Sequence, residues 1–329
     1  MRDDGRTVTL EHVARAAGVS RATASRALTG SGPASEDVVR RVRAAADELG
    51  YVADPVARAL VQRGGTRVVV AVTAATDDVL ECHYTDQVVR AAAQVCHPAG
   101  LGVSLQWLPL TGDPAALDAL ARDRTVRGLV LVNTTYALLD ALPRRLRGRV
   151  ASIGVGAPAV PSVDVDVGWA MAAVVAHLVA TGRRRIAMIT GPPWLPCARY
   201  PVAAYRDAVL AAGLPVRTVV GGHALANGRA GAAEALQRWP DTDALIGSCD
   251  DVALGAVATV RRLGRRVPDD VAVTGFDDIP AAEFAGPSLT TATHPVDLIA
   301  SAAVRAVLTG ARSDEGILFP SRLVLRDSA

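Results

Sequence analysis

The sequence is poor in several residue types, and these shortages exclude some classes of protein. It contains no lysine, so its positive side chains are arginine and histidine, and its formal net charge is only +2. A chain of this balance does not bind polyanions over its whole surface. Four cysteines among 329 residues do not make the disulfide framework of a small secreted domain. We attribute the missing lysine to a biased genomic composition rather than to selection for arginine's paired hydrogen bonds.

Segments that would carry a protein to or through a membrane are also missing. The first ten residues, MRDDGRTVTL, have no apolar core of a signal peptide. No run approaches the roughly 18 uncharged apolar residues that span a bilayer. We therefore expect a soluble cytoplasmic protein without a membrane partner. Half of the residues are hydrophobic, which is enough for one small domain and a two-lobed body.

The first part of the chain, residues 1–63, has the spacing of a small helical unit. A short helix is predicted over residues 10–17, and Gly18 ends it. Ser20 is placed to cap a second helix over residues 21–28. Apolar residues at helical spacing predict a third helix after a short loop. This pattern indicates a compact unit of short helices.

From residue 64 on, apolar runs alternate with helical patterns. The strand-like runs are RVVVAV, LGVSLQWL, GLVLVN, VASIGV, RRIAMITG, VRTVVG, DALIGS and DVAVTGF, and helical patterns cover 86–96, 168–181, 227–238 and 251–263. Continuous apolar runs of this kind predict parallel strands covered on both faces by helices. Because the runs are too many for one sheet, we predict an α/β fold of two Rossmann-like lobes. A ligand cleft between the lobes should lie at the carboxyl ends of the strands.

These segments, taken in order, resemble one known family. The stretch VTLEHVARAAGVSRATASRALTGSGPASEDVVRRVRAAADELGYVADPVARAL resembles the DNA-binding head of the lactose-repressor (LacI) family. The segments VPSVDVD, AHLVATGRRRIAMITGP, CDDVALGAVATVRRLGRRVPDDVAVTGFDDIP and SLTTATHP resemble its body. The resemblance implies an N-terminal helix-turn-helix head over 1–63 with a hinge helix at about 54–61. It also implies a periplasmic-binding-protein-like core over 64–329 that binds an effector and dimerises.

The resemblance also implies which residues contact DNA. In a helix-turn-helix the second helix enters the major groove with its N-terminus, so Arg21 and Ala22 are expected to set operator preference. Arginine can hold guanine O6 and N7 with two hydrogen bonds, whereas alanine can only touch a thymine methyl. Leu60 matches a leucine that wedges between base steps. The expected DNA-binding set is Thr9, Ser20, Arg21, Ala22, Thr23, Ser25, Arg26 and Leu60. A solvated surface charge at Arg21 and an apolar contact to the body at Leu60 remain alternatives.

Six residues are expected to bind the effector: Tyr84, Trp194, Arg199, Cys249, Asp250 and Asp277. Asp277 matches the family's cleft aspartate, for which we expect hydrogen bonds from ligand hydroxyls rather than a structural loop contact. Asp250 matches the aspartate of the family's Asn-Asp pair, whose asparagine is replaced here by Cys249. The ring of Trp194 could stack on a sugar or a planar base, or pack in the wall.

One departure from the family concerns the effector. Pro201 stands where the family carries a cleft arginine, and Arg199 lies two residues earlier. The loss of that arginine argues against a standard sugar effector.

The cysteines and histidines permit a second kind of effector chemistry. Cys82, Cys197 and Cys249 map to loops at the cleft and would allow a thiol- or metal-linked effector, although scattered cysteines are more often small core residues. The Cys-His pairs at 82–83 and 96–97 flank a helix of roughly 12 residues, about 18 Å long. That distance is too great for a shared zinc ion. We expect no metal and no cofactor.

Three classes of function compete. The leading one is a sequence-specific, DNA-binding transcriptional regulator on the nucleoid, expected to act as a repressor. Its partners would be a pseudo-palindromic double-stranded DNA operator, a small-molecule effector (a sugar, nucleoside or other metabolite) and a second copy in a homodimer. A solute-binding protein or sensor would share the body but would need a signal peptide and no reading head. An enzyme using Asp277 and Asp278 finds no nucleophile–base pair, phosphate loop or metal spacing, so we expect no catalytic residues.

Overall fold

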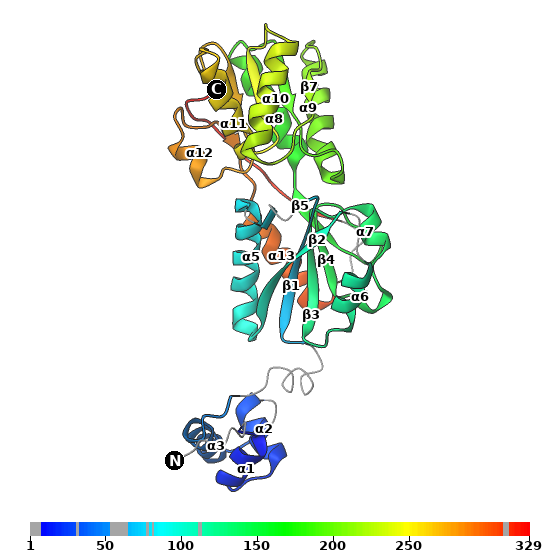
Figure 1. The fold of residues 1–329 in the computed structure, drawn as a ribbon, viewed down its shortest axis with the longest axis vertical. Coiled ribbons are helices and arrows are strands. Elements are labelled where there is room, and N and C mark those ends of the chain that lie inside the picture. The colour runs from blue at the N-terminus through cyan, green and yellow to red at the C-terminus, as the bar shows by residue number, and fades with distance from the viewer. Residues whose placement is uncertain are drawn as a thin grey trace. The chain divides into compact units, whose positions relative to one another are not determined.

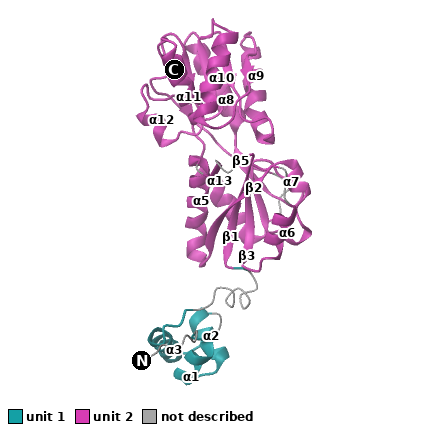
Figure 2. Ribbon diagram, viewed as in Figure 1, with its two compact units in different colours: residues 1–65 teal, residues 66–329 magenta. Residues whose placement is uncertain are grey.

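The computed structural model describes residues 8–30, 33–52, 65–76, 79–80, 82–110, 114–311 and 316–329. The chain forms two compact units, residues 1–65 and 66–329, which Figure 2 shows in different colours. The expected domain boundary at 63–64 and the hinge helix with Leu60 lie outside the described residues. In the described ranges, no helix reaches the length and apolarity that a bilayer crossing requires.

The first unit contains three helices: α1 (Leu10–Ala16), α2 (Arg21–Thr29) and α3 (Glu36–Glu48). Gly18 makes the turn between α1 and α2 with a φ of 65°, a conformation that glycine adopts without strain. The Ser20 hydroxyl accepts a hydrogen bond from the Thr23 N–H at 3.1 Å, which confirms the predicted cap. Each helix buries an apolar side chain in one small core, of which Val13, Ala24 and Val42 are fully buried.

Two parallel sheets form the second unit (Figure 1). The first has the strand order β11-β5-β4-β3-β1-β2 and the second the order β7-β6-β8-β9. The first sheet consists of β1 (Arg67–Ala74), β2 (Gly102–Pro109), β3 (Val126–Val132), β4 (Val150–Ile153), β5 (Ser162–Val165) and β11 (Ile317–Phe319). The second consists of β6 (Ile186–Ile189), β7 (Thr218–Val219), β8 (Ala244–Gly247) and β9 (Ala272–Thr274). A short antiparallel pair, β10 (Thr291–Ala292) and β12 (Leu323–Val324), completes the strands of the described residues.

Helices cover both faces of each sheet. They are α5 (His83–Cys96), α6 (Pro114–Arg122), α7 (Tyr136–Asp140) and α13 (Val296–Thr309) in the first lobe, and α8 (Val167–Ala180), α9 (Arg199–Ala211), α10 (Leu225–Arg238), α11 (Asp250–Arg262) and α12 (Pro280–Phe284) in the second. Along β6, Ile186 and Met188 enter one core while Ala187 and Ile189 enter the other. This alternation is the geometry of a strand buried on both faces, so the predicted two-lobed α/β architecture is confirmed.

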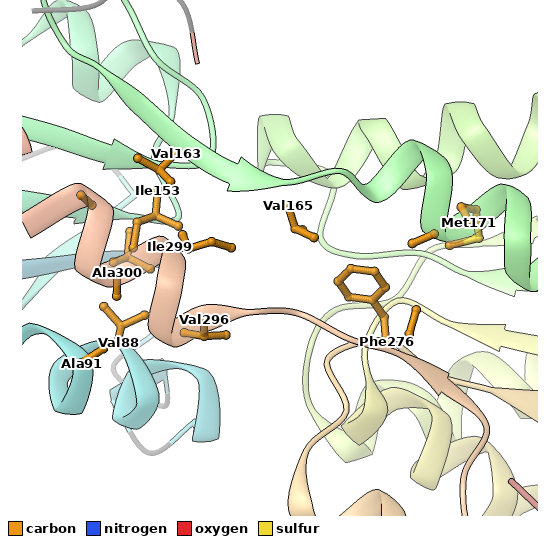
Figure 3. Close-up of a cluster of buried hydrophobic side chains, with 14 of the residues drawn as sticks. Val88, Ala91, Ile153, Val163, Val165, Met171, Phe276, Val296, Ile299 and Ala300 are labelled. Carbon is orange, nitrogen blue, oxygen red and sulfur yellow. The ribbon is translucent and has the colours of Figure 1, made fainter. Parts of the chain in front are cut away.

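The chain passes between the two lobes three times: from β5 into α8, from β10 into α13, and from β11 into β12. Apolar side chains line these passages and continue one core from lobe to lobe. Figure 3 shows Val165, the last residue of β5, on the side of the first lobe that faces Phe276 and Met171 of the second lobe. The three crossing segments are therefore packed against apolar side chains of both lobes.

Candidate functional site

A cavity of about 850 Å³ is lined by residues of both lobes. Its wall contains residues at or just after the carboxyl end of β1, β3, β4, β5, β8 and β9, among them Ala74, Asn133, Gly154, Asp164, Ser248 and Asp277. The predicted location of the ligand site, beyond the strand ends of an open parallel sheet, is thus occupied by a cavity. Its volume lies within the range of small-molecule sites.

Four of the six predicted effector residues line this cavity: Tyr84, Trp194, Cys249 and Asp277. Tyr84 and Cys249 come from the starts of α5 and α11, and Trp194 comes from the loop after β6. The structure brings these side chains together from both lobes. Arg199 and Asp250 are not in the cavity wall.

Asp250 has a structural role instead. Its side chain is fully buried, its two carboxyl oxygens accept hydrogen bonds from the Thr291 hydroxyl at 2.5 Å and from the Ile279 N–H at 2.8 Å, and its own N–H donates to the Phe276 carbonyl. These bonds tie the start of α11 to the loop after β9. The prediction of ligand contact at this position is wrong because the carboxyl faces the lobe's interior.

The segment at the start of α9 places a different residue in the wall. Arg199 begins the helix, and the cavity is lined two residues later by Pro201. Tyr205, further along α9, is buried, and its hydroxyl lies 2.8 Å from the Ile186 carbonyl. The cavity therefore receives no cationic side chain from α9.

Asp277 is held in an unusual backbone conformation at the cavity. Its φ of 112° is costly for a residue with a Cβ, and its N–H donates to the Ala292 carbonyl. One of its carboxyl oxygens lies 2.9 Å from Nδ1 of His294. The His294 ring contacts two other rings, those of Tyr84 at 5.1 Å and Phe276 at 5.5 Å between centroids. His294 lies on the segment that crosses from β10 to α13, and its contacts with Tyr84 of the first lobe and with Asp277 and Phe276 of the second thus connect this segment to both lobes.

Five further aspartate and histidine residues in the wall are absent from the predicted effector set: His83, Asp164, His223, Asp251 and His294. Burial raises the pKa of Asp164, and burial followed by the charge of Asp277 raises the pKa of Asp251. Burial lowers the pKa of His223, which favours the neutral imidazole. Asp164 lies near the end of β5, His223 follows β7 and Asp251 lies in the first turn of α11, so the rule that sites lie at strand ends could have found these three.

Two of the three cleft cysteines, Cys197 and Cys249, are packed as neutral thiols. Cys82, Cys197 and Cys249 all line the cavity, as the sequence suggests. Burial raises the pKa of Cys197 to about 12 and also raises that of Cys249 well above its usual value. Such thiols are poor nucleophiles and poor metal ligands near neutral pH. Nowhere in the described residues do three His, Cys, Asp or Glu side chains gather in a way that could hold a metal ion.

The second helix of the first unit presents a short polar face. Arg21, Ala22 and Arg26 are exposed on α2, whereas Ala24 and Ala27 are buried in the core. Thr23 and Ser25 lie half-buried beside this face, and Ser20 precedes it as the cap. Thr9 caps α1, where its N–H donates to Nδ1 of His12 at 3.2 Å. The seven described members of the predicted DNA-binding set are all at least partly accessible.

Comparisons with known proteins match this architecture. Residues 9–54 match the model of bacterial regulatory proteins of the lacI family, and residues 175–329 match that of a periplasmic binding protein-like domain. The HTH-type transcriptional regulator CelR of Thermobifida fusca is 34% identical over 97% of this chain and 96% of its own. A structure of the CelR–cellobiose complex superposes with a TM-score of 0.70, at 29% identity, over 98% of this chain and 100% of its own.

A second solved structure, that of the Lac repressor dimer bound to operator and the anti-inducer ONPF, has a TM-score of 0.84. It is 25% identical and covers 98% of this chain and 99% of its own. The likeness thus extends over head and body together. The chain is a DNA-binding transcriptional regulator that belongs, as its sequence predicts, to the lacI family of bacterial regulatory proteins.

Proposed function

We propose that the protein is a repressor that binds a pseudo-palindromic operator as a homodimer. Its affinity for the operator changes when an effector binds in the cavity. One observation carries the proposal. The same chain combines an exposed arginine face on the second helix of its head with a cavity of about 850 Å³ at the strand ends of its body. A solute-binding protein would use the cavity but not the arginine face.

In this proposal residues 1–63 read DNA, and the first turn of α2 determines the preferred sequence. Arg21 and Ala22 are exposed at the N-terminal end of α2, which is the end that approaches base edges in the major groove. Arg21 holds a guanine, and Ala22 leaves room for a thymine methyl. Thr9, Ser20, Thr23, Ser25 and Arg26 position the helix on the backbone, and Leu60 enters the minor groove. Because the operator is part of the chromosome, the protein works in the nucleoid.

The body, residues 64–329, holds the effector and the second copy of the chain. The relative CelR was solved with cellobiose and the Lac repressor dimer with operator, which supports a small hydroxyl-bearing ligand and a two-fold assembly. Asp277 accepts hydrogen bonds from the ligand, the Trp194 ring packs against one of its faces, and Tyr84 and Cys249 complete the contact. Asp277 binds the ligand in this proposal and performs no catalytic step.

The head is tested by measuring fluorescence anisotropy of labelled DNA from upstream of the protein's own gene. Arg21→Ala should lower discrimination at one G·C pair by about 1–3 kcal/mol, because a paired arginine–guanine contact is lost. Arg43→Ala, which removes the same charge from the exposed face of α3, is the matched control. It should leave sequence preference unchanged. Equal weakening of all sequences by Arg21→Ala would instead place Arg21 on the phosphates.

A further inference from the structure

The charges of the cavity wall are unbalanced. Three carboxylates line it, Asp164, Asp251 and Asp277, and among the described lining residues there is no arginine. The chain has no lysine that could replace one. Of the three histidines in the wall, His223 is held neutral by burial. The described wall therefore contains three carboxyl groups and no permanently charged cation.

Two partly buried carboxylates elsewhere in the body are paired with arginine. Asp123 lies 2.9 Å from Arg67, and Asp278 lies 2.7 Å from Arg326. Asp164, in contrast, accepts a hydrogen bond only from the adjacent N–H of Val165 among the described residues. A carboxylate that is partly removed from water without a cation is costly, so a wall of this kind is poised to accept one.

The carboxylates come from both lobes. Asp164 lies on β5 of the first lobe, whereas Asp251 lies in the first turn of α11 and Asp277 follows β9, both in the second. Burial raises the pKa of the Tyr84 phenol, and the charges of Asp164 and Asp277 raise it further. Carboxylates of both lobes thus act on the same phenol in the wall. A positive group bound between the lobes would relieve repulsion across the cavity and draw the lobes towards it.

The remaining polar and aromatic groups suit a hydrogen-bond donor with positive charge. Nδ1 of His294 faces the Asp277 carboxylate, and its Nε2 is buried with no hydrogen-bond partner among the described residues. When Nδ1 carries the proton for Asp277, Nε2 is a free acceptor. The rings of Tyr84, Trp194 and Phe276 also line the cavity, and aromatic faces attract ammonium groups.

We propose that the effector is a cation: a protonated amine on a hydroxylated body of about disaccharide size, held between Asp164 of one lobe and Asp251 and Asp277 of the other. The inference rests on the proposed function, because it names the ligand of the same cavity. Pro201, which lines the wall at the family's arginine position, neither repels a cation nor supplies a charge for an anion. Neutral sugar hydroxyls could donate hydrogen bonds to the three carboxylates but would supply no positive charge to offset them.

Three disaccharides of the same backbone test the proposal on the full chain by isothermal titration calorimetry. They are cellobiose, the β-1,4-linked disaccharide of glucosamine, which carries two protonated amines at pH 6, and its neutral N-acetylated form. The diamine should bind at least about tenfold more tightly than either neutral sugar, since each ammonium gains a carboxylate partner. Asp164→Asn, which keeps the acceptor for Val165, should remove most of that advantage. Asp140→Asn, on the exposed end of α7, should not.

The thermal midpoint of the ligand-free protein gives a second measurement. Asp164→Asn should raise it at pH 7, because the variant removes an unpaired charge from the wall, whereas Asp140→Asn should leave it unchanged. Cellobiose binding as tightly as the diamine overturns the cation proposal and leaves effector control intact. Failure of all three sugars to bind, with no rise in the midpoint, also overturns it. Tight binding of the diamine that leaves operator affinity unchanged would refute the regulatory function and leave the cation site standing.

Discussion

Replacing Asp250 with asparagine should make the body more stable, and the gain should depend on pH. The carboxyl is fully buried at the start of α11, and burial, with a smaller contribution from the charge of Asp277, raises its pKa to about 8. The folded protein therefore keeps a proton on Asp250 at neutral pH. In the unfolded chain the same group titrates near its ordinary value of 3.8.

The sign and size of the effect follow from these two values. At pH values between 3.8 and about 8, the folded state binds a proton that the unfolded state lacks. The stabilisation by this proton is complete below pH 3.8 and is lost as the pH rises towards about 8. The free energy of unfolding falls by about 1.4 kcal/mol per pH unit in this window, or about 3 kcal/mol between pH 5 and pH 7. Asparagine does not titrate. Its carbonyl can accept from the Ile279 N–H, and its amide can donate to the Thr291 hydroxyl, so both native contacts survive.

Urea unfolding followed by tryptophan fluorescence measures this difference in the body alone, because Trp107, Trp169, Trp194 and Trp239 all lie within residues 66–329. The stability gap between Asp250→Asn and the wild type should widen by about 3 kcal/mol from pH 5 to pH 7. The exposed Asp140→Asn change should show a constant gap. A constant gap for Asp250→Asn would refute the reasoning, since it would mean that Asp250 is ionised in the folded protein.

Three further predictions concern packing and thiol reactivity. Gly255→Ala should destabilise the body by about 3 kcal/mol in the same urea assay, because the new Cβ would lie 2.2 Å from the Leu225 carbonyl oxygen where α10 and α11 cross. The control Gly102→Ala adds a Cβ with only ordinary contacts and should cost less than about 1 kcal/mol, so equal costs would contradict this explanation. Ala24→Leu should abolish DNA binding by overfilling the core of the head while leaving tryptophan-monitored unfolding unchanged, and retained DNA binding would speak against that core. Cys197 should react with iodoacetamide at pH 8 about a hundredfold more slowly in the native than in the unfolded protein, as followed by mass spectrometry, and similar rates would show that the thiol is not buried as described.

The long elements of the fold were predictable because each leaves a local pattern. The run RVVVAV is rich in apolar residues because both faces of β1 are covered, and the run GLVLVN at β3 has the same cause. The strands β5, β11 and β12 have only two to four residues each, which is too short for the sequence pattern to identify them as strands. The pairing of β11 with β5 joins segments about 150 residues apart, and this return of the chain to the first lobe leaves no local signal.

The site was predictable by position in the chain but not by side-chain direction. Trp194 and Asp277 follow strands and line the cavity, as expected. Asp250 and Asp251 are neighbours at the start of one helix, yet only Asp251 lines the cavity while Asp250 turns into the lobe. Successive residues of a helix point in directions about 100° apart, so the sequence alone could not say which of the two would face the ligand.

Control of operator binding by the cavity ligand is the central claim, and one titration tests it directly. Fluorescence anisotropy of the upstream DNA should be measured with the full chain, without ligand and then with saturating glucosamine disaccharide or cellobiose. We predict sequence-specific binding whose apparent Kd changes by at least about fivefold when one of these ligands occupies the cavity. A ligand that calorimetry shows to be bound but that leaves the Kd unchanged, or the absence of specific DNA binding in every ligand state, would contradict this prediction.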